Sequence, residues 1–544
     1  MASSLVRSTT VVSGMTFISR ILGFGRDVVL AVMFGAGPAM DAFLVAFKIP
    51  NFLRRLFAEG AFAQSFVPVL SATRDQESGD DVKALVSVVA GTLGVILMAL
   101  TVIGVIAAPL LIYLFAPGFA ENAAQFDLAV DLLRLTFPYL FFISLTALAG
   151  GVLNTYGRFA VPAVTPVLLN ICLIGAAALL SPYFAEPTIG LAIGVFVAGV
   201  AQLVFQVPFL VRLDRLPRPR WGWANEKVRR ILKLMLPIMF GSSIAQIMLL
   251  LDTIVASFLA SGSVSWLYYA DRLMEFPLGV FSIAIATVIL PSLSARHAAK
   301  STEAFSATLD WALKVLMVLG LPAMVGLFIL AGPLVVTLFN YRSFTTHDVW
   351  MSQYALMAYS LGFMGFSIVK VLVTGFFSRE DSRTPVKCGV ISMLSAMAMN
   401  LIFVGLFIWR GWSAPHAGLA LAGSLGAFVN AGLLYLYLRR SGAYTPGPGW
   451  AIMYLRIVIG CVIMASVLHI GAADATTWMG REAWMRAAWL ALWILAGVAI
   501  YFVTLAATGL RPHHLRMATT ADDCLLYTSP SPRDKRQSRM PSSA

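Results

Sequence analysis

Residues 16–37 read TFISRILGFGRDVVLAVMFGAG, an apolar run of membrane-crossing length that is interrupted by Arg20, Arg26 and Asp27. About twenty apolar residues span the hydrocarbon core of a bilayer as a helix. A charged side chain at that depth costs roughly 2.5–3.5 kcal/mol on insertion scales, so it has to face water or another charge. The run therefore predicts a membrane helix that borders a polar interior.

Two further apolar runs, 40–70 and 263–291, are interrupted in the same way. Their charged residues are Asp41, Lys48, Arg54, Arg55 and Glu59 in the first, and Asp271, Arg272 and Glu275 in the second. Several basic helices around one water-filled cavity predict a pathway for an anionic substrate.

The composition indicates an all-α polytopic membrane protein. Of the 544 residues, 59% are hydrophobic and 12% are charged, whereas soluble proteins average about 45–50% and about 25%. The apolar residues fall in long runs, which are typical of membrane helices and unlike the short alternating strands of membrane barrels. We predict about fourteen spans: 8–34, 40–71, 85–115, 129–156, 161–181, 187–211, 230–260, 264–294, 305–338, 349–377, 385–409, 415–438, 451–471 and 485–508.

The distribution of basic residues predicts the orientation. The connection 212–233 is rich in Lys and Arg, and the connections of the same parity also carry basic residues. The opposite connections are almost free of them, apart from Arg342, Arg410 and Arg481. By the positive-inside rule both termini are expected in the cytoplasm. The same rule accounts for the net charge of +13 without a nucleic-acid partner.

Nothing in the sequence indicates an enzyme or a metal centre. The four cysteines have no metal-ligand spacing, the six histidines are scattered, and no Walker-type glycine-rich loop is present. We expect a transporter without a cofactor, which uses a coupling cation (Na⁺ or H⁺), the membrane potential or substrate supply for energy.

A short internal sequence repeat predicts that the chain consists of two related halves. VPVLSA at 67–72 resembles LPSLSA at 290–295, six spans later. An even offset gives both halves the same topology, related by an axis along the membrane normal. We predict an N-terminal lobe at 1–222, a C-terminal lobe at 223–440 and two additional helices at 441–516. Residues 522–544, polar and aperiodic, are interpreted as a non-native or disordered tail.

Arg26, Arg54 and Arg272 are the candidate ligands for a diphosphate, because arginine stays protonated and presents a planar fork of donors. The alternative is that each arginine only neutralises a nearby acid. Asp27 is adjacent to Arg26, and adjacent helical residues are not expected to face each other. Arg272 could pair with Glu275, and Arg55 with Glu59. Arg20 is six residues before Arg26, on roughly the opposite side of the helix.

Two acids have readings that the sequence leaves open. Asp41 begins its span and is either a favourable acid at a helix N-terminus or part of an external gate. Asp252 has no basic residue within a helical turn. It is either a coupling site for a cation or a protonated acid that is hydrogen-bonded to a neighbouring helix.

Several of these segments resemble one known family. The run from Ser19 to Leu70, GRFAVPAVTPVLLNI at 157–171, ASGSVSWLYYADRLMEFPLGV at 260–280, SLSARHA at 292–298 and VKVLVTGFFSREDSRTPVK at 369–387 resemble the MurJ (MviN) lipid II flippases. The resemblance extends over about residues 5–516. It implies the fold of the multidrug/oligosaccharidyl-lipid/polysaccharide exporter superfamily, with two six-helix lobes and two extra helices that form a groove for the lipid tail.

The resemblance also implies a function in peptidoglycan synthesis and hence in cell-wall biogenesis and cell shape. The substrate would be lipid II, moved by alternating access across the bacterial inner membrane by a monomer in contact with membrane lipids. The cavity arginines of the family fall on Arg20, Arg26, Arg54 and Arg272, and its essential acids fall on Asp41 and Glu275. Asp27, Glu59 and Asp271 are further candidate cavity or gate acids. The alternative is an exporter of another lipid-linked oligosaccharide or a drug/cation antiporter.

Overall fold

The computed structural model describes residues 2–55, 62–76, 78–472 and 474–510, and within these ranges the chain is helical throughout its regular structure. The helices of the N-terminal half are α1 (Ala2–Phe34), α2 (Pro38–Arg54), α3 (Ala63–Gln76), α4 (Gly79–Ile106), α5 (Ala108–Phe115), η2 (Pro117–Glu121), α6 (Ala123–Thr136), α7 (Tyr139–Thr155), α8 (Ala160–Gly175), η3 (Ala176–Leu180), η4 (Ser181–Tyr183) and α9 (Pro187–Arg212).

The second half continues with helices of similar length. They are α10 (Glu226–Ser257), α11 (Ser263–Ala298), α12 (Thr302–Ile329), α13 (Ala331–Phe339), α14 (Thr346–Phe377), α15 (Arg383–Trp409), α16 (His416–Arg440), α17 (Trp450–Ala472), α18 (Ala475–Met479) and α19 (Ala483–Ala507).

The prediction of an all-helical polytopic membrane protein is confirmed. Within the described residues, eleven helices or uninterrupted helical segments are long and apolar enough to cross a membrane. The three remaining predicted spans coincide with α1, with α2 and α3, and with α10. Helices satisfy every backbone hydrogen bond internally, which a segment in lipid requires.

Some predicted spans are broken, which the hydropathy pattern could not show. The span 85–115 divides at Ala107 into α4 and α5, and the span 305–338 divides at Leu330 into α12 and α13. A proline follows each break within three residues, at 109 and 333, and proline cannot donate the backbone hydrogen bond that would continue the helix. The two breaks are 223 positions apart in the sequence, and so are the starts of α4 and α12. The two halves therefore share this feature.

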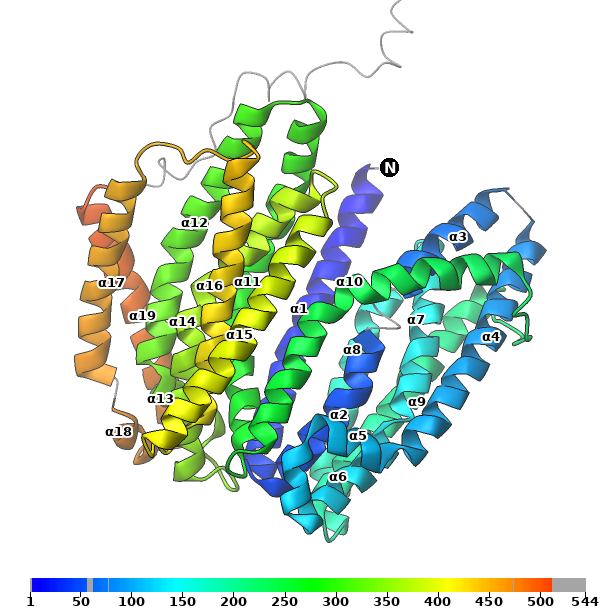
Figure 1. Ribbon diagram of the computed structural model, residues 1–544, viewed down its shortest axis with the longest axis horizontal. Coiled ribbons are helices and arrows are strands. Elements are labelled where there is room, and N and C mark those ends of the chain that lie inside the picture. The colour runs from blue at the N-terminus through cyan, green and yellow to red at the C-terminus, as the bar shows by residue number, and fades with distance from the viewer. Residues whose placement is uncertain (1, 56–61, 77, 473, 511–544) are drawn as a thin grey trace, which may run out of the picture.

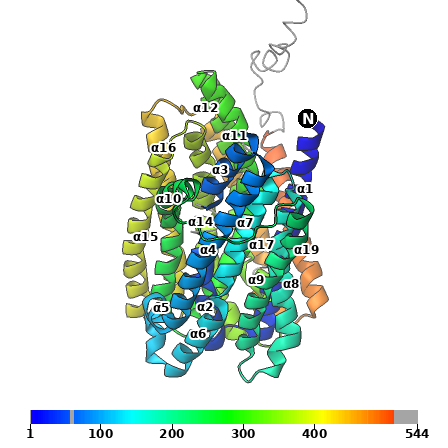
Figure 2. The same ribbon diagram turned by 90° about the vertical axis from the view of Figure 1, so that its right-hand side faces the viewer.

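The helices form two groups that lie side by side, and α1, on the inner side of the first group, borders the second (Figure 1). In the first group, α7 packs on α9, α1 on α8 and α2 on α6; in the second, α14 packs on α16, α11 and α12. Helix α10 contacts α3 in the first group and α15 in the second. Figure 2 shows the first group in front, with its helices running along the same direction as those behind.

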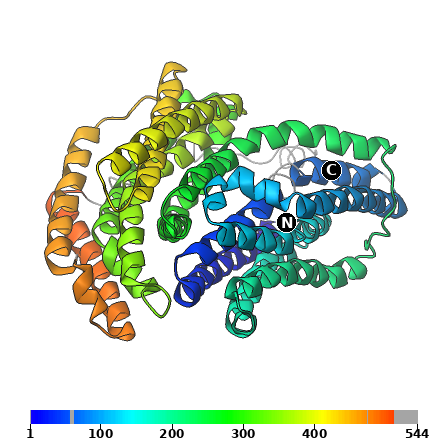
Figure 3. The same ribbon diagram turned by 60° about the horizontal axis from the view of Figure 1, so that its bottom comes forward.

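The molecule has an upper and a lower end in the view of Figure 1. The upper end carries the N-terminus, and α2, α11 and α14 begin at the lower end. The final helices α17 and α19 pack on each other and on α12. They form the edge of the molecule that lies farthest from the first group (Figure 3).

Candidate functional site

Arg26 on α1 lies in a network of polar side chains from three helices. Its guanidinium donates from Nε and Nη2 to Oδ1 of Asp27 at 2.9 and 2.6 Å, and from Nη1 to Oδ1 of Asn170 on α8 at 3.1 Å. Nη2 also donates to the Tyr268 hydroxyl on α11 at 3.3 Å, and that hydroxyl donates to Asp27 at 2.8 Å. Only 12% of the Arg26 side chain and 3% of the Asp27 side chain are exposed, so the pair is held away from bulk solvent.

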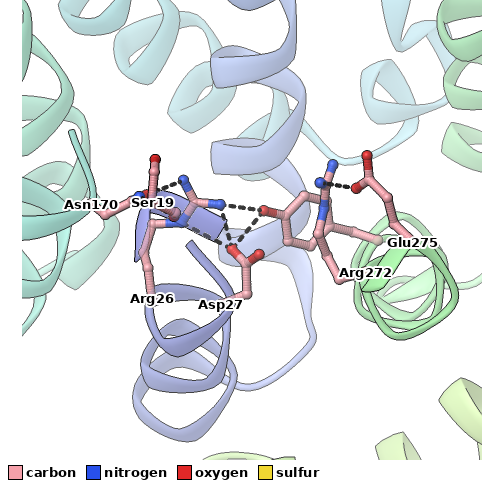
Figure 4. A network of polar contacts seen from close by, with 7 residues as sticks. Ser19, Arg26, Asp27, Asn170, Arg272 and Glu275 are labelled. Carbon is pink, nitrogen blue, oxygen red and sulfur yellow. Dashed lines mark hydrogen bonds and ion pairs between the residues drawn. The ribbon is translucent and has the colours of Figure 1, made fainter. Parts of the chain in front are cut away.

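Arg272 meets the same network from α11. Its guanidinium carbon is 5.1 Å from the centre of the Tyr268 ring, a cation–π distance, and Nη1 is paired with Glu275. Figure 4 shows the guanidinium groups of Arg26 and Arg272, each beside its own carboxylate. The buried Nε of Arg272 has no hydrogen-bond partner among the described residues. Two positive charges from α1 and α11 therefore share one aromatic residue, and one donor of Arg272 is unused.

The other two predicted arginines are placed differently. The Arg20 guanidinium lies against Gly279 of α11, where a Cβ atom would overlap it. Arg20 therefore faces the same helix as Arg26 does. The described hydrogen bond of Arg54 runs from Nε to Oδ1 of Asn51 in its own helix, at 2.8 Å. This hydrogen bond within α2 does not show whether Arg54 shares a site with the other three arginines.

A second group of charges joins α2, α10 and α11. Lys48 donates to Thr253 Oγ1 at 2.6 Å, and Asn400 of α15 donates to Asp252 Oδ1 at 2.9 Å. Lys48 also interacts electrostatically with Asp252, Asp271 and Arg272, which places this group next to the first one. The charges of α1, α2, α10 and α11 are thus gathered where the two helix groups meet.

Asp41 joins the two helix groups at the lower end. Its buried carboxylate, on α2, accepts hydrogen bonds from the Gly262 N–H at 2.7 Å, the Ser265 N–H at 2.8 Å and the Ser265 hydroxyl at 2.5 Å. These donors are at the N-terminus of α11, where free N–H groups and the helix dipole favour a negative charge. Gly262 has φ +99°, a conformation that glycine adopts without strain and that starts the helix at this point.

Further contacts between the groups lie at the same end. The Tyr269 hydroxyl donates to the Gly35 carbonyl at 3.2 Å, the Ser343 hydroxyl donates to the Met33 carbonyl at 2.9 Å, and the Gly118 N–H donates to the Ser257 hydroxyl at 3.1 Å. With Asp41, they hold α1, α2 and η2 against the second group at the lower end.

The structure decides several of the sequence expectations. The expectation that Arg26 and Asp27 would not face each other is wrong, because the long arginine side chain folds back to reach the adjacent carboxylate. The predicted pair of Arg272 and Glu275 is confirmed. Glu59, and with it the suggested pair with Arg55, lies outside the described residues, as do 511–516 and the tail 522–544.

The structure also shows the contacts of the two acids whose roles the sequence leaves open. The printed hydrogen bonds of the Asp41 carboxylate go to the N-terminus of α11, not to that of its own helix, and a role in gating stays a prediction. Asp252 does accept a hydrogen bond from a neighbouring helix, through Asn400, and it has Lys48 close enough for an electrostatic interaction. The water-filled cavity that we expect around these charges stays a prediction.

Sequence reasoning missed four residues that connect the charges. Lys48 was visible as a charge in an apolar run but was not assigned to the site. Asn170 and Asn400 are single amides in apolar helices, a pattern that predicts a helix–helix hydrogen bond without naming the partner. Nothing in the sequence around Tyr268 distinguishes it from Tyr269, because only the folded structure shows which ring meets both arginines.

Comparisons with known proteins agree with this architecture. The family model described as "Lipid II flippase MurJ" matches residues 30–487. The chain is 46% identical over 526 residues to the "Probable lipid II flippase MurJ" of Vibrio cholerae, covering 95% of this chain and 98% of that protein. It is 40% identical over 519 residues to the "Lipid II flippase MurJ" of Burkholderia cenocepacia, covering 94% and 99%.

Solved structures show the same fold. A structure described as "Lipid II flippase MurJ, inward closed conformation" superposes with a TM-score of 0.75 at 28% identity, covering 91% of this chain and 97% of that one. An inward-facing multidrug transporter of the MATE family, in the MOP superfamily, gives a TM-score of 0.63 at 16% identity and covers 80% and 98%. The second likeness shows a shared fold alone.

Proposed function

Because the chain belongs to the lipid II flippase MurJ family, we propose that it moves lipid II from the inner to the outer leaflet of the bacterial cytoplasmic membrane. Lipid II is a polyprenyl diphosphate that carries the disaccharide-pentapeptide of peptidoglycan, so the transport supplies cell-wall synthesis. The chain is a multi-pass membrane transporter, and the observation that carries the proposal is the pair of guanidinium groups, from Arg26 and Arg272, that both contact Tyr268.

The orientation proposed here places the upper end in the cytoplasm. The connections at the lower end are those with few basic residues, and the connection between α9 and α10 at the upper end is rich in Arg. Both termini are then cytoplasmic. The contacts of Asp41, Tyr269 and Ser343 close the outer end of the molecule, which corresponds to a state that receives substrate from the cytoplasm.

The diphosphate binds between α1 and α11 in this proposal. Arg26 and Arg272 have carboxylate partners in the substrate-free chain, and a dianionic diphosphate replaces Asp27 and Glu275 as the acceptor. The unused Nε of Arg272 supplies one further donor. Arg20, next to Gly279, and Arg54 are the additional cations along the path. Removing charge–charge repulsion between the arginines lets α1 and α11 approach, and this closes the cytoplasmic side.

Alternating access then depends on the contact between Asp41 and α11. When the diphosphate draws the two groups together at the cytoplasmic side, Asp41 leaves the N-terminus of α11 and the outer end opens. The helix groups that rock are the N-terminal lobe at 1–222 and the C-terminal lobe at 223–440. A monomer suffices, since one chain carries both groups.

We propose Asp252 as the site where a coupling cation, Na⁺ or H⁺, acts. Its carboxylate lies between Asn400 and Lys48, close to the charges that contact the substrate. A proton or Na⁺ on Asp252 would change the balance of charge around Lys48 and Asp271. The membrane potential is the alternative source of energy.

The prenyl tail stays in lipid along α17 and α19 in this account. Large apolar side chains of both helices are exposed, among them Leu455 and Val462 on α17 and Leu495 and Val503 on α19. The region 441–516 would thus give the tail an apolar surface while the headgroup crosses between the lobes.

Export of another lipid-linked oligosaccharide is the nearest different specificity, and a drug/cation antiporter is a more distant one. The likeness to the MATE transporter extends to the fold alone, at 16% identity. The relatives with 40–46% identity carry the lipid II flippase description instead.

The test of the proposed function is the amount of lipid II in the outer leaflet after rapid inactivation of this protein in cells that lack any other lipid II flippase. We expect outer-leaflet lipid II to fall within minutes while total lipid II rises. Unchanged outer-leaflet lipid II, with accumulation of a different lipid-linked sugar on the inner side, would instead identify one of the related exporters.

A further inference from the structure

A basic pocket opens at the upper end of the second helix group, away from the charges between α1 and α11. It lies where α11 turns into α12 and meets the ends of α14 and α16, and it has a volume of about 140 Å³. We call it the upper basic pocket and define it by Arg296, His297, Lys300 and Arg379. Arg296 lies 24 residues beyond Arg272 in α11, roughly 36 Å along the helix, so the two places are separate.

The lining of the upper basic pocket is positive and contains no carboxylate. Arg379 donates from Nη1 to the Ser441 hydroxyl at 3.2 Å, and within the described residues no ion pair of Arg379, Lys300 or His297 occurs. Asp381 interacts electrostatically with Arg379 but already accepts hydrogen bonds from Arg383 and Thr384 at the start of α15. Within the described residues, the pocket therefore presents two cationic side chains, Lys300 and Arg379, that form no ion pair.

One wall is held rigidly. Arg296, of which 8% is exposed, donates from Nε to the Ser292 hydroxyl at 3.2 Å and from Nη1 to the Ala304 carbonyl at 3.0 Å. These contacts fix the turn between α11 and α12, and the His297 ring packs against Phe305 with the ring centres 6.5 Å apart. A fixed wall loses little freedom when an anion binds, which favours binding.

The N-terminal half provides an internal comparison. Ser78 and Ser301 are the N-cap residues of α4 and α12, 223 positions apart. At α4, Ser78 and Asp81 form a reciprocal capping box that occupies the helix N-terminus. The residue 223 positions after Asp81 is Ala304, and Ser301 makes no side-chain cap. Helix α12 keeps an acid in its first turn, Glu303, but it lacks the capping box that occupies the start of α4.

From these observations we propose that the upper basic pocket binds a phosphate group. Its volume equals roughly that of four to five water molecules and is well below the 300–1,000 Å³ of sites for larger ligands. It thus fits a small tetrahedral anion or a diphosphate rather than a nucleotide. Phosphate groups are commonly bound by arginine and lysine side chains and by free backbone N–H groups at the start of a helix.

Two sources can supply this chemistry. Helix α11 has 36 residues, about 54 Å, and so extends beyond a hydrocarbon core of about 30 Å. Its end therefore lies where it can meet either a phosphate headgroup of the inner leaflet or a soluble phosphate of the cytoplasm. The bound phosphate would join α11, α12 and α14 at their ends and fix the second helix group as a unit. This inference does not depend on the proposed substrate.

The experiment is calorimetric titration of the full-length protein, purified in detergent, with three probes: pyrophosphate, inorganic phosphate and dihexanoyl phosphatidic acid. All proteins carry R26Q/R272Q, which removes the diphosphate site of the proposed function. The test variant adds K300Q/R379Q, and the matched control adds R439Q/R440Q, which removes equal charge at the same end outside the pocket. Thermal unfolding without probe identifies any variant that is misfolded.

We expect the R26Q/R272Q protein to bind at least one of the probes. The affinity should fall about 100-fold in the test variant, about tenfold for each charge-assisted contact that is lost, and should not change in the control. Binding of phosphatidic acid alone identifies a lipid headgroup, and binding of the soluble probes identifies a cytoplasmic phosphate. Absence of binding by all three probes, or equal weakening in the test variant and the control, would overturn the proposal. A single K300Q variant serves if the double variant misfolds.

Discussion

At the scale of single residues, Tyr268 connects charges that come from different parts of the sequence. Its hydroxyl contacts Arg26 and Asp27 of α1, and its ring faces Arg272 of its own helix. Hydroxyl and ring thus have separable roles. We expect the hydroxyl to compete with Arg26 for Asp27, whereas the ring lies against the guanidinium of Arg272.

The Tyr268→Phe variant tests this separation. The variant loses the hydrogen bond from the hydroxyl to Asp27, about 1 kcal/mol, and the longer one from Arg26 to the hydroxyl. We expect Asp27 to bind Arg26 more tightly as a result, which lowers the affinity for lipid II about fivefold. Tyr268→Leu also removes the ring and should weaken binding further. The measurement is lipid II binding to the purified protein in detergent. Equal affinities of the Phe variant and the unaltered chain would show that the hydroxyl is only a structural contact.

Asp41 is the second residue with a distinct expected effect. Asp41→Asn removes the charge from the N-terminus of α11 and replaces one of the two carboxylate oxygens by a donor. About 2 kcal/mol of the contact is lost, so the outer end should open in a much larger fraction of molecules. Spin labels at Glu121 and Arg342, both exposed at the lower end, should show longer distances by pulsed electron resonance.

The control for that experiment is Asp127→Asn, which changes an exposed carboxylate of α6 near the same end. Its distance distribution should match that of the unaltered protein. An unchanged distribution in Asp41→Asn would mean that Asp41 does not hold the outer end closed.

At the scale of elements, the connection between α9 and α10 is bound to α4 rather than free between the two groups. The Arg220 N–H donates to the Ser87 carbonyl at 3.0 Å, and the Gly222 N–H donates to Thr92 Oγ1 at 3.2 Å. A Cβ atom at Gly91 would lie within 3 Å of backbone atoms of Arg220. The contact therefore requires glycine at this position of α4.

Gly91→Ala should release this connection, whereas Gly94→Ala should not. Nothing lies within 4 Å of a Cβ atom at Gly94, and alanine there gains up to about 1 kcal/mol of helix propensity. We expect faster proteolysis of 213–225 and a lower melting temperature in Gly91→Ala only. If both variants melt together with the unaltered protein, the connection does not depend on close backbone contact with α4.

The helices themselves could be predicted from the sequence, because a long continuous apolar run satisfies its backbone hydrogen bonds in lipid by forming a helix. The breaks at Ala107 and Leu330 could not, since each piece remains apolar and only the local backbone changes. The charged helices of the site were identifiable from the energetic cost of buried charge. Their partners were not, because the side chains of Asn170, Tyr268 and Asn400 meet those charges only after distant helices pack together.

At the scale of the whole molecule, the two helix groups meet at the lower end and are crossed by α10 (Figure 1). The final helices are fixed to the second group at both ends. Arg486 donates to the Asn340 carbonyl at 3.1 Å, and Asp310 accepts from Tyr444 and Trp450 at 2.9 and 2.8 Å. Helices α17 and α19 should therefore move with the second group when the lobes rock.

Cross-linking across the lower end tests whether rocking is required. Met33→Cys and Ser343→Cys, in a chain whose four native cysteines are replaced, place thiols at a contact between the groups. A short bifunctional thiol reagent should stop transport of lipid II, and each single-cysteine chain should stay active with the same reagent. Full transport by the cross-linked chain would show that the outer end need not open.

The central claim is that positive charge on Arg26 and Arg272 carries the diphosphate across. The most direct test measures the amount of lipid II in the outer leaflet of cells whose only lipid II flippase is a variant of this protein. The variants are Arg26→Ala, Arg272→Ala and the charge-retaining Arg272→Lys. Arg410→Ala, at an exposed basic residue, is the control. We predict that both alanine variants lose transport at normal protein levels, that lysine retains part of it and that Arg410→Ala is unaffected. Normal outer-leaflet lipid II in the two alanine variants would contradict the account.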